Sequence, residues 1–142
     1  MTDHNFLPSY KNEVQRITLS SGIEIAYVDE GDKSQPPLVM VHGWGGYLKN
    51  WYANIDELKS DFRCIALDLP GYGLSSLEYY EEDDYLDFFA RSVDEFITNL
   101  GLQNVYLLGH SMGGQVATIL AIGQPYWLRH LILAAPAGLE TF

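Results

Sequence analysis

The 142-residue sequence has a single cysteine, few basic residues and no long apolar run. One cysteine, Cys64, excludes a disulfide within the chain. No apolar stretch approaches the roughly 18 residues of a membrane-spanning helix, and residues 1–10 lack a basic segment followed by an apolar one. We therefore expect a soluble protein in a reducing compartment, most simply the cytoplasm.

Positive charge is also scarce. Eight Lys and Arg residues accompany 19 Asp and Glu residues, which gives a net charge of −11. This charge repels nucleic acid and anionic lipid, so neither nucleic acid nor a membrane is an expected partner. The four histidines lack metal-ligand spacing, so no metal is expected. The acidic stretch from Glu78 to Glu95 favours a solvated loop and helix face over a patch that binds a cation or a partner.

The sequence contains enough hydrophobic residues to form a globular core. Hydrophobic residues make up 47% of the chain and charged residues 19%, as in ordinary folded domains. Short apolar runs alternate with amphipathic segments, which predicts an α/β fold, a mostly parallel sheet with helices on both faces. The expected strands are an N-terminal β-hairpin of Val14–Leu19 and Ile23–Val28, then Leu38–Val41, Cys64–Leu67, Val105–Leu108 and Leu131–Ala134. The expected helices are Asn50–Leu58, Asp83–Leu100 and Met112–Ile122.

The most informative segment is Gly109-His-Ser-Met-Gly113, which stands between a predicted strand and a predicted helix. In Gly-x-Ser-x-Gly the turn is too tight for side chains on either side of the serine, so glycines keep the two backbones close. The Ser111 hydroxyl is thereby pushed outward, and the Met112 N–H lies at a helix N-terminus that favours a developing negative charge. The alternative is a serine that only caps the helix. The strand-turn-helix context favours a nucleophile.

A second glycine-rich turn, His42-Gly-Trp-Gly-Gly46, follows the predicted strand Leu38–Val41. Backbone N–H groups in such a turn can face a cleft, which is what an oxyanion hole requires. A phosphate-binding turn is the competing interpretation. It fails because Leu48 and Ser76 stand where the last glycine of Gly-x-Gly-x-x-Gly is required, and no Gly-Lys-Ser/Thr follows any loop.

These two turns and a third segment occur in a characteristic order. His42-Gly-Trp-Gly-Gly46 resembles the oxyanion loop of the α/β-hydrolase superfamily, Asp68-Leu-Pro-Gly-Tyr-Gly-Leu-Ser75 the loop after its fourth strand, and Gly109-His-Ser-Met-Gly-Gly114 its nucleophile elbow. The resemblance extends from about Val14 onward. It implies Ser111 as the nucleophile and the backbone N–H groups of Trp44 and Met112 as oxyanion donors. The residues that it implies as support for the two turns are His42, Gly43, Gly45, Gly109, His110 and Gly113.

The resemblance also implies what the chain lacks. In the superfamily the catalytic order is Ser, then Asp or Glu, then His, and both partners normally follow the sixth strand. Here little chain follows Ser111, and Leu131–Ala134 corresponds to that sixth strand. We therefore interpret residues 1–142 as the N-terminal part of an α/β-hydrolase domain, a truncated core in which the cap, the acid loop, the catalytic histidine loop and the last strands are absent.

None of the four histidines is expected to replace the missing base. His42 opens the glycine-rich loop and is expected to make structural hydrogen bonds, and His110 lies next to the serine on a turn that points its ring elsewhere. His130 is expected at a strand edge and His4 in the N-terminal tail. Without a histidine, Glu140 has nothing to orient. The chain by itself is therefore expected to be inactive or weakly active.

Two functions remain open. The first is an esterase-like serine hydrolase that acts on a small-molecule ester or related carbonyl substrate without a cofactor, because side chains and amides carry the chemistry. By the same resemblance, a serine at the elbow argues against the superfamily's haloalkane dehalogenases and epoxide hydrolases, which carry aspartate there. The second is a non-catalytic folded fragment or assembly module that retains the motifs.

Two surfaces bear on these functions. One hypothesis is an apolar cleft lined by Trp44, Tyr47, Trp51 and Tyr72, which would favour an apolar acyl or aryl substrate. The equal alternative is that Trp51 lies in the core and the tyrosines lie at the surface. The apolar strand Leu131–Ala134 would form an unpaired sheet edge, which is a template for pairing with another chain. We therefore expect self-association or a complementary C-terminal fragment.

Overall fold

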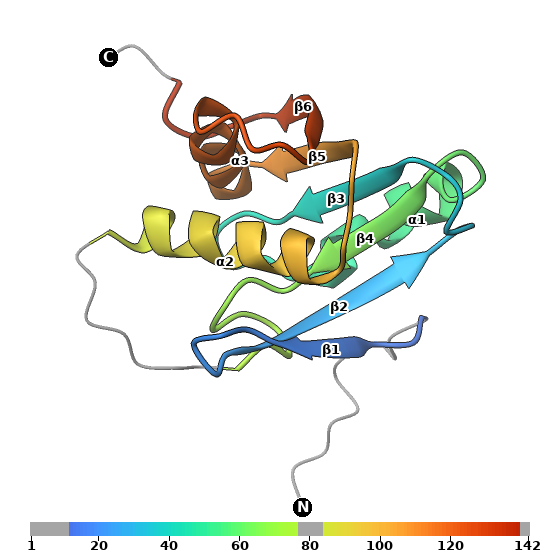
Figure 1. The fold of residues 1–142 in the computed structure, drawn as a ribbon, viewed down its shortest axis with the longest axis horizontal. Helices are drawn as coiled ribbons and strands as arrows, with labels where there is room; N and C mark the ends of the chain where they lie inside the picture. The colour runs from blue at the N-terminus through green and yellow to red at the C-terminus, as the bar shows by residue number, and fades with distance from the viewer. Residues whose placement is uncertain (1–11, 77–83, 140–142) are drawn as a thin grey trace, which may run out of the picture.

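One six-stranded sheet organises residues 12–76 and 84–139, which are the residues that the computed structural model describes (Figure 1). Its spatial order is β1-β2-β4-β3-β5-β6. The hairpin strands β1 and β2 pair antiparallel, β2 pairs antiparallel with β4, and the other neighbours are parallel. The strands are β1 (Gln15–Thr18), β2 (Glu24–Glu30), β3 (Pro37–Val41), β4 (Arg63–Leu67), β5 (Val105–His110) and β6 (Leu128–Ala134).

Helices cover both faces of this sheet, which confirms the predicted α/β architecture. The amphipathic helices α2 (Tyr85–Asn99) and α3 (Met112–Ile122) pack on one face, and α1 (Tyr52–Leu58), preceded by the 3-10 turn η2 (Leu48–Trp51), packs on the other. Side chains alternate along each strand, so Val39 of β3 faces α2 and α3 while Met40 faces α1. Within the described residues, no helix is both long and apolar enough to span a bilayer.

Most element boundaries lie within a residue or two of the sequence prediction, and the informative differences are at η2, α2 and β6. The predicted helix at residue 50 begins instead with η2, where the Asn50 side chain accepts the Tyr47 N–H at 2.8 Å. Helix α2 begins after Asp84, whose carboxylate accepts the N–H groups of Leu86 and Asp87, and the predicted start at Asp83 lies outside the described residues.

Strand β6 begins at Leu128, earlier than the predicted Leu131. Its start is fixed by Trp127, which is fully buried and donates its ring N–H to Asp94 of α2 at 2.7 Å. The polar residues Arg129 and His130 interrupt the apolar pattern, but an outer strand can expose them to solvent.

The carboxyl ends of β3, β4 and β5 lie next to one another in the sheet. The loops that leave them are therefore neighbours, as at the ligand-binding edge of other open α/β sheets. These loops carry the three motifs singled out above.

Candidate active site

Ser111 stands at the turn from β5 to α3 in a conformation that only glycine adopts readily, with φ 54° and ψ −121°. The turn is closed by glycines. A Cβ atom on Gly109 would overlap the Gly113 carbonyl, and one on Gly113 would overlap the Val41 and His42 carbonyls. The close approach of β5, α3 and β3 therefore holds the strained serine in place.

The Ser111 side chain lies against the glycine-rich loop after β3. A Cβ atom on Gly43 would be 2.9 Å from Ser111 Cβ and 3.4 Å from its Oγ. Together they line a cavity of about 150 Å³, whose other lining residues are Trp44, Gly45, Gly46, Asn50 and His110. Asn50 was not singled out by the sequence, because its place in the cavity depends on η2.

Two backbone donors are available near this cavity. Among the described residues, neither the Trp44 N–H nor the Met112 N–H has a hydrogen-bond acceptor. Met112 is the first residue of α3, where the helix dipole favours negative charge. The Ser111 carbonyl, by contrast, accepts N–H groups from Gly114 at 2.9 Å and Ala137 at 3.1 Å, which anchors the turn from behind. The arrangement can bind a carbonyl oxygen or an oxyanion.

His42 is buried and both of its ring nitrogens are engaged. The Leu69 N–H donates to Nε2 at 3.0 Å, so Nε2 carries no proton, and Nδ1 donates to the Gly43 carbonyl at 2.8 Å. Burial lowers the pKa of the imidazole below its ordinary value. His42 is thus a neutral structural bridge between the loops after β3 and β4, as expected.

Protonation of His42 is expected to destabilise the protein. Its folded pKa lies below the unfolded value of 6.5, so its contribution to stability is present above pH 6.5 and is lost as the pH falls through the folded pKa. The free energy of unfolding should decrease by at most about 1.4 kcal/mol per pH unit in this range. Urea denaturation on both sides of pH 6.5 measures it.

A matched variant isolates the effect of His42. In His42→Gln the side-chain oxygen still accepts the Leu69 N–H but does not titrate, while the other histidines remain. We expect a weaker pH dependence in this variant. An equal slope in both proteins would assign the titration elsewhere.

Asp68 is the most important residue near the site for which the sequence did not indicate a role. It is fully buried, and its carboxylate accepts the Leu48 N–H at 2.6 Å and the Leu74 N–H at 2.8 Å. Burial raises the pKa of this carboxyl, and the two N–H groups act in the opposite direction. Ser75 adds a hydrogen bond to the Asp68 carbonyl at 2.6 Å. Asp68 thereby ties the glycine-rich loop to the loop after β4.

Within the described residues, neither His110 nor His130 is hydrogen-bonded to Ser111 Oγ, although His110 lines the same cavity. His110 is exposed, with its ring 6.5 Å from that of Trp51, and His130 is exposed on β6, with its ring 4.7 Å from that of Tyr106. His4 and Glu140 lie outside the described residues. Over residues 12–76 and 84–139, no three His, Cys, Asp or Glu side chains are grouped to hold a metal ion.

Cys64 is not an alternative nucleophile. It is fully buried in β4, and desolvation raises the pKa of its thiol to about 11. A thiol with that pKa stays protonated and unreactive at neutral pH.

The aromatic residues of the predicted cleft separate into two groups. Trp51 is buried in the core beside α1, so its alternative place in the core is the correct one. Tyr47 and Tyr72 are half-buried, and Trp44 is highly exposed.

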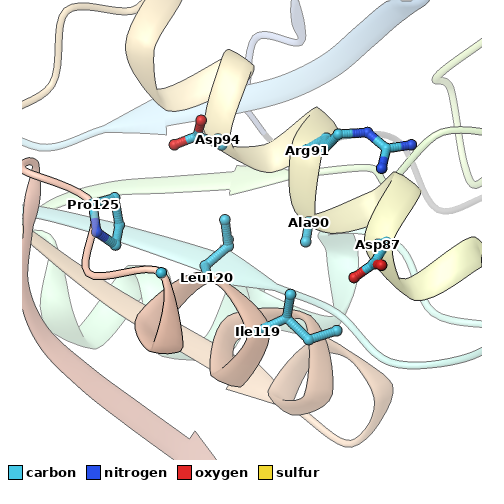
Figure 2. Close-up of a pocket in the computed structure, with 8 residues that line it drawn as sticks. Asp87, Ala90, Arg91, Asp94, Ile119, Leu120 and Pro125 are labelled. Carbon is cyan, nitrogen blue, oxygen red and sulfur yellow. The ribbon is translucent and has the colours of Figure 1, made fainter.

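A separate hollow of about 340 Å³ lies between α2 and α3 (Figure 2). Ile119 on its floor is eight residues after Ser111, about 12 Å along a helix. One of its acidic groups, Asp94, is already bonded to Trp127. None of the described residues that line it is a serine, cysteine or histidine, so it does not share the chemistry of the Ser111 cavity.

Comparisons with known proteins agree with this fold. A family profile described as the alpha/beta hydrolase fold matches residues 36–142. A rat protein named 1-acylglycerol-3-phosphate O-acyltransferase is 35% identical over 132 residues, which cover 92% of this chain and 38% of the relative. Mouse epoxide hydrolase 4 is 32% identical over 113 residues, which cover 80% of this chain and 32% of the relative.

Solved structures are similar over most of the chain. A bacterial membrane phospholipase A superposes with a TM-score of 0.84 at 31% identity, covering 90% of this chain and 41% of that one. The chain thus spans between about one third and two fifths of the length of these relatives. Their names describe acyl transfer, epoxide hydrolysis and phospholipid hydrolysis, so the similarity extends over more than one reaction.

Proposed function

Because this chain belongs to the α/β-hydrolase family, we propose that it carries the nucleophile and oxyanion half of a serine hydrolase. Its substrate would be a small-molecule ester or a related carbonyl compound. The observation that supports this most is the strained Ser111, held by glycines against a loop with unengaged backbone donors. A serine that only caps a helix needs neither feature.

The proposed reaction is attack by Ser111 Oγ on the substrate carbonyl carbon, after which the ester C–O bond breaks, the alcohol leaves with a proton and water hydrolyses the acyl-serine. The carbonyl oxygen, which gains negative charge, is held by the N–H groups of Trp44 and Met112 at the start of α3. The proton of the hydroxyl must pass to a base, and no histidine of the described residues is bonded to Ser111. We propose that an acid and a histidine from outside residues 1–142 complete the site, so this chain alone is weakly active.

The serine at position 111 also favours one of the reactions named for the relatives over the others. Epoxide hydrolysis is expected to need a carboxylate at position 111, where this chain has serine, so acyl transfer from an ester is the reaction that we propose. Neither a metal nor a cofactor is required for it. We also propose that the protein acts in the cytoplasm, from its single buried cysteine and acidic composition.

A fluorophosphonate probe tests the proposal. The probe should label the folded chain at Ser111, slowly because no base is present, and Ser111→Ala should reduce labelling to background. Ser60→Ala, which removes an exposed serine of a surface loop, should label like the wild type. Peptide mass spectrometry locates the adduct. A folded chain without a Ser111 adduct would refute the proposal.

The outer edge of β6 favours the second candidate function, an assembly module. Within the described residues β6 pairs only with β5, and Leu131 and Ile132 expose 36% and 41% of their surface on opposite faces. An exposed apolar strand edge recruits further strands. We propose that the isolated chain associates with a second copy through the outer edge of β6. A complementary C-terminal fragment would pair with the same edge in place of the second copy.

This association is expected to be lost in Ile132→Lys, because a charge on an edge strand opposes pairing. Light scattering during size-exclusion chromatography should give an oligomer for the wild type and mainly the 16.0 kDa chain for the variant. Ile122→Lys is the matched control, since Ile122 is 75% exposed and lies in α3, not on the edge strand. A wild-type chain that is monomeric at all concentrations would disprove the association.

A further inference from the structure

A cluster of four aromatic rings stands beside the Ser111 cavity. The ring centroid of Trp44 lies 6.4 Å from that of Tyr72 and 6.1 Å from that of Tyr85, both edge to face. Phe89 completes the cluster, 5.9 Å from Tyr72 and 6.0 Å from Tyr85. The rings come from the loop after β3, the loop after β4 and the first turns of α2. Three separate elements thus contribute apolar side chains to one surface beside the Ser111 cavity.

One ring of the cluster is buried in the core, and two others are exposed to solvent. Phe89 is buried in the core, whereas Trp44 is 73% exposed and Tyr85 is 44% exposed. Aromatic rings supply large apolar contact areas when they are covered, so a fixed but uncovered group of them is typical of binding surfaces. Edge-to-face contacts hold the exposed rings in position before any ligand arrives.

A hollow of about 390 Å³ lies next to the cluster. It is lined by Gly45, Gly46, Tyr47, Gly71, Tyr72, Gly73 and Leu74. Gly45 and Gly46 also line the Ser111 cavity, so the two spaces adjoin at the glycine-rich loop. Its volume is at the lower end of small-molecule pockets, which suits one apolar group rather than a whole lipid. None of these lining residues carries a charge at neutral pH, so an ionic group forms no ion pair there.

We propose that Trp44, Tyr72 and Tyr85, together with this hollow, form the subsite for an apolar acyl group of medium length. The inference rests on the proposed serine nucleophile and names the substrate class of that site. A carbonyl oxygen held by the Trp44 N–H places the attached chain beside the indole of the same residue. Trp44 therefore positions the oxygen through its backbone and the acyl chain through its side chain.

A pair of fluorophosphonates with methyl and octyl groups on phosphorus tests the subsite. The octyl probe should label Ser111 at least about tenfold faster, since each buried methylene contributes about three- to fourfold and only part of the chain is covered. Trp44→Ala and Tyr85→Ala should each reduce the octyl-to-methyl ratio severalfold. Tyr126→Ala is the control, because Tyr126 is 71% exposed but lies outside the cluster and the hollow. Equal rates for the two probes, or a ratio that neither variant changes, would overturn the subsite.

A binding measurement separates the subsite from the nucleophile. If neither probe labels Ser111, the proposed reaction fails, and the subsite is then judged by titrating octanamide into Ser111→Ala. Octanamide should change the fluorescence of exposed Trp44, because Trp51 and Trp127 are buried, and the change should be absent in Trp44→Ala. Tyr85→Ala should weaken binding severalfold. No response to octanamide, or a response that persists without Trp44, would overturn the subsite.

Discussion

Gly113→Ala is expected to lower the free energy of unfolding by about 3 kcal/mol or more. A methyl group at this position would overlap the carbonyl groups of Val41 and His42, which are backbone atoms at the end of β3 and cannot turn aside. Overpacking of a closed core typically costs about 1–3 kcal/mol, and more where backbone must move. The better helix propensity of alanine returns only about 1 kcal/mol. The steric overlap therefore outweighs the gain in helix propensity, and the free energy of unfolding decreases.

Gly123→Ala is a matched control at the other end of the same helix. Gly123 also has a negative φ of −70°, and its nearest neighbour to an added Cβ is the Leu120 carbonyl at 3.3 Å. We expect a change within about 0.5 kcal/mol, as for ordinary surface substitutions. Urea denaturation of the two variants measures the difference. Similar midpoints for Gly113→Ala and the wild type would show that β3 and α3 are not held together as closely as the structure indicates.

The elements that the sequence predicted well are those whose signal is local. The parallel strands are short continuous apolar runs, α2 has an unbroken helical period, and the Ser111 turn combines three signals within five residues. Each of these patterns depends on neighbours in the chain. The sheet, its N-terminal hairpin and the position of the Ser111 turn were therefore predictable before any tertiary contact was known.

The features that the sequence missed depend on distant partners. Strand β6 begins at Leu128 because Trp127 is held by Asp94, a contact across 33 positions of the chain. Asn50 enters the Ser111 cavity only through η2. The sequence does not indicate whether the Trp51 side chain faces a cleft or the core. The position of α1 places it in the core.

Asp68 belongs to the same group, and Asp68→Ala is expected to have the second large effect. The substitution removes the acceptors of the buried Leu48 N–H and the partly buried Leu74 N–H. An unsatisfied buried donor costs about 1–3 kcal/mol and a partly buried one less, so a total loss of about 2–4 kcal/mol is expected. Asp68→Asn keeps one acceptor oxygen but turns an NH2 group toward the other donor, and should lose about half as much.

The loss should extend to reactivity, because Asp68 holds the loop that carries Trp44. Under conditions where Asp68→Asn remains folded by circular dichroism, fluorophosphonate labelling of Ser111 should still fall severalfold, since the Trp44 N–H is no longer held at the cavity. Asp61→Ala, which removes an exposed carboxylate in the loop before β4, is the control and should change neither stability nor labelling. If a folded Asp68→Asn chain labelled at the wild-type rate, Asp68 would support the fold without positioning the glycine-rich loop that carries Trp44.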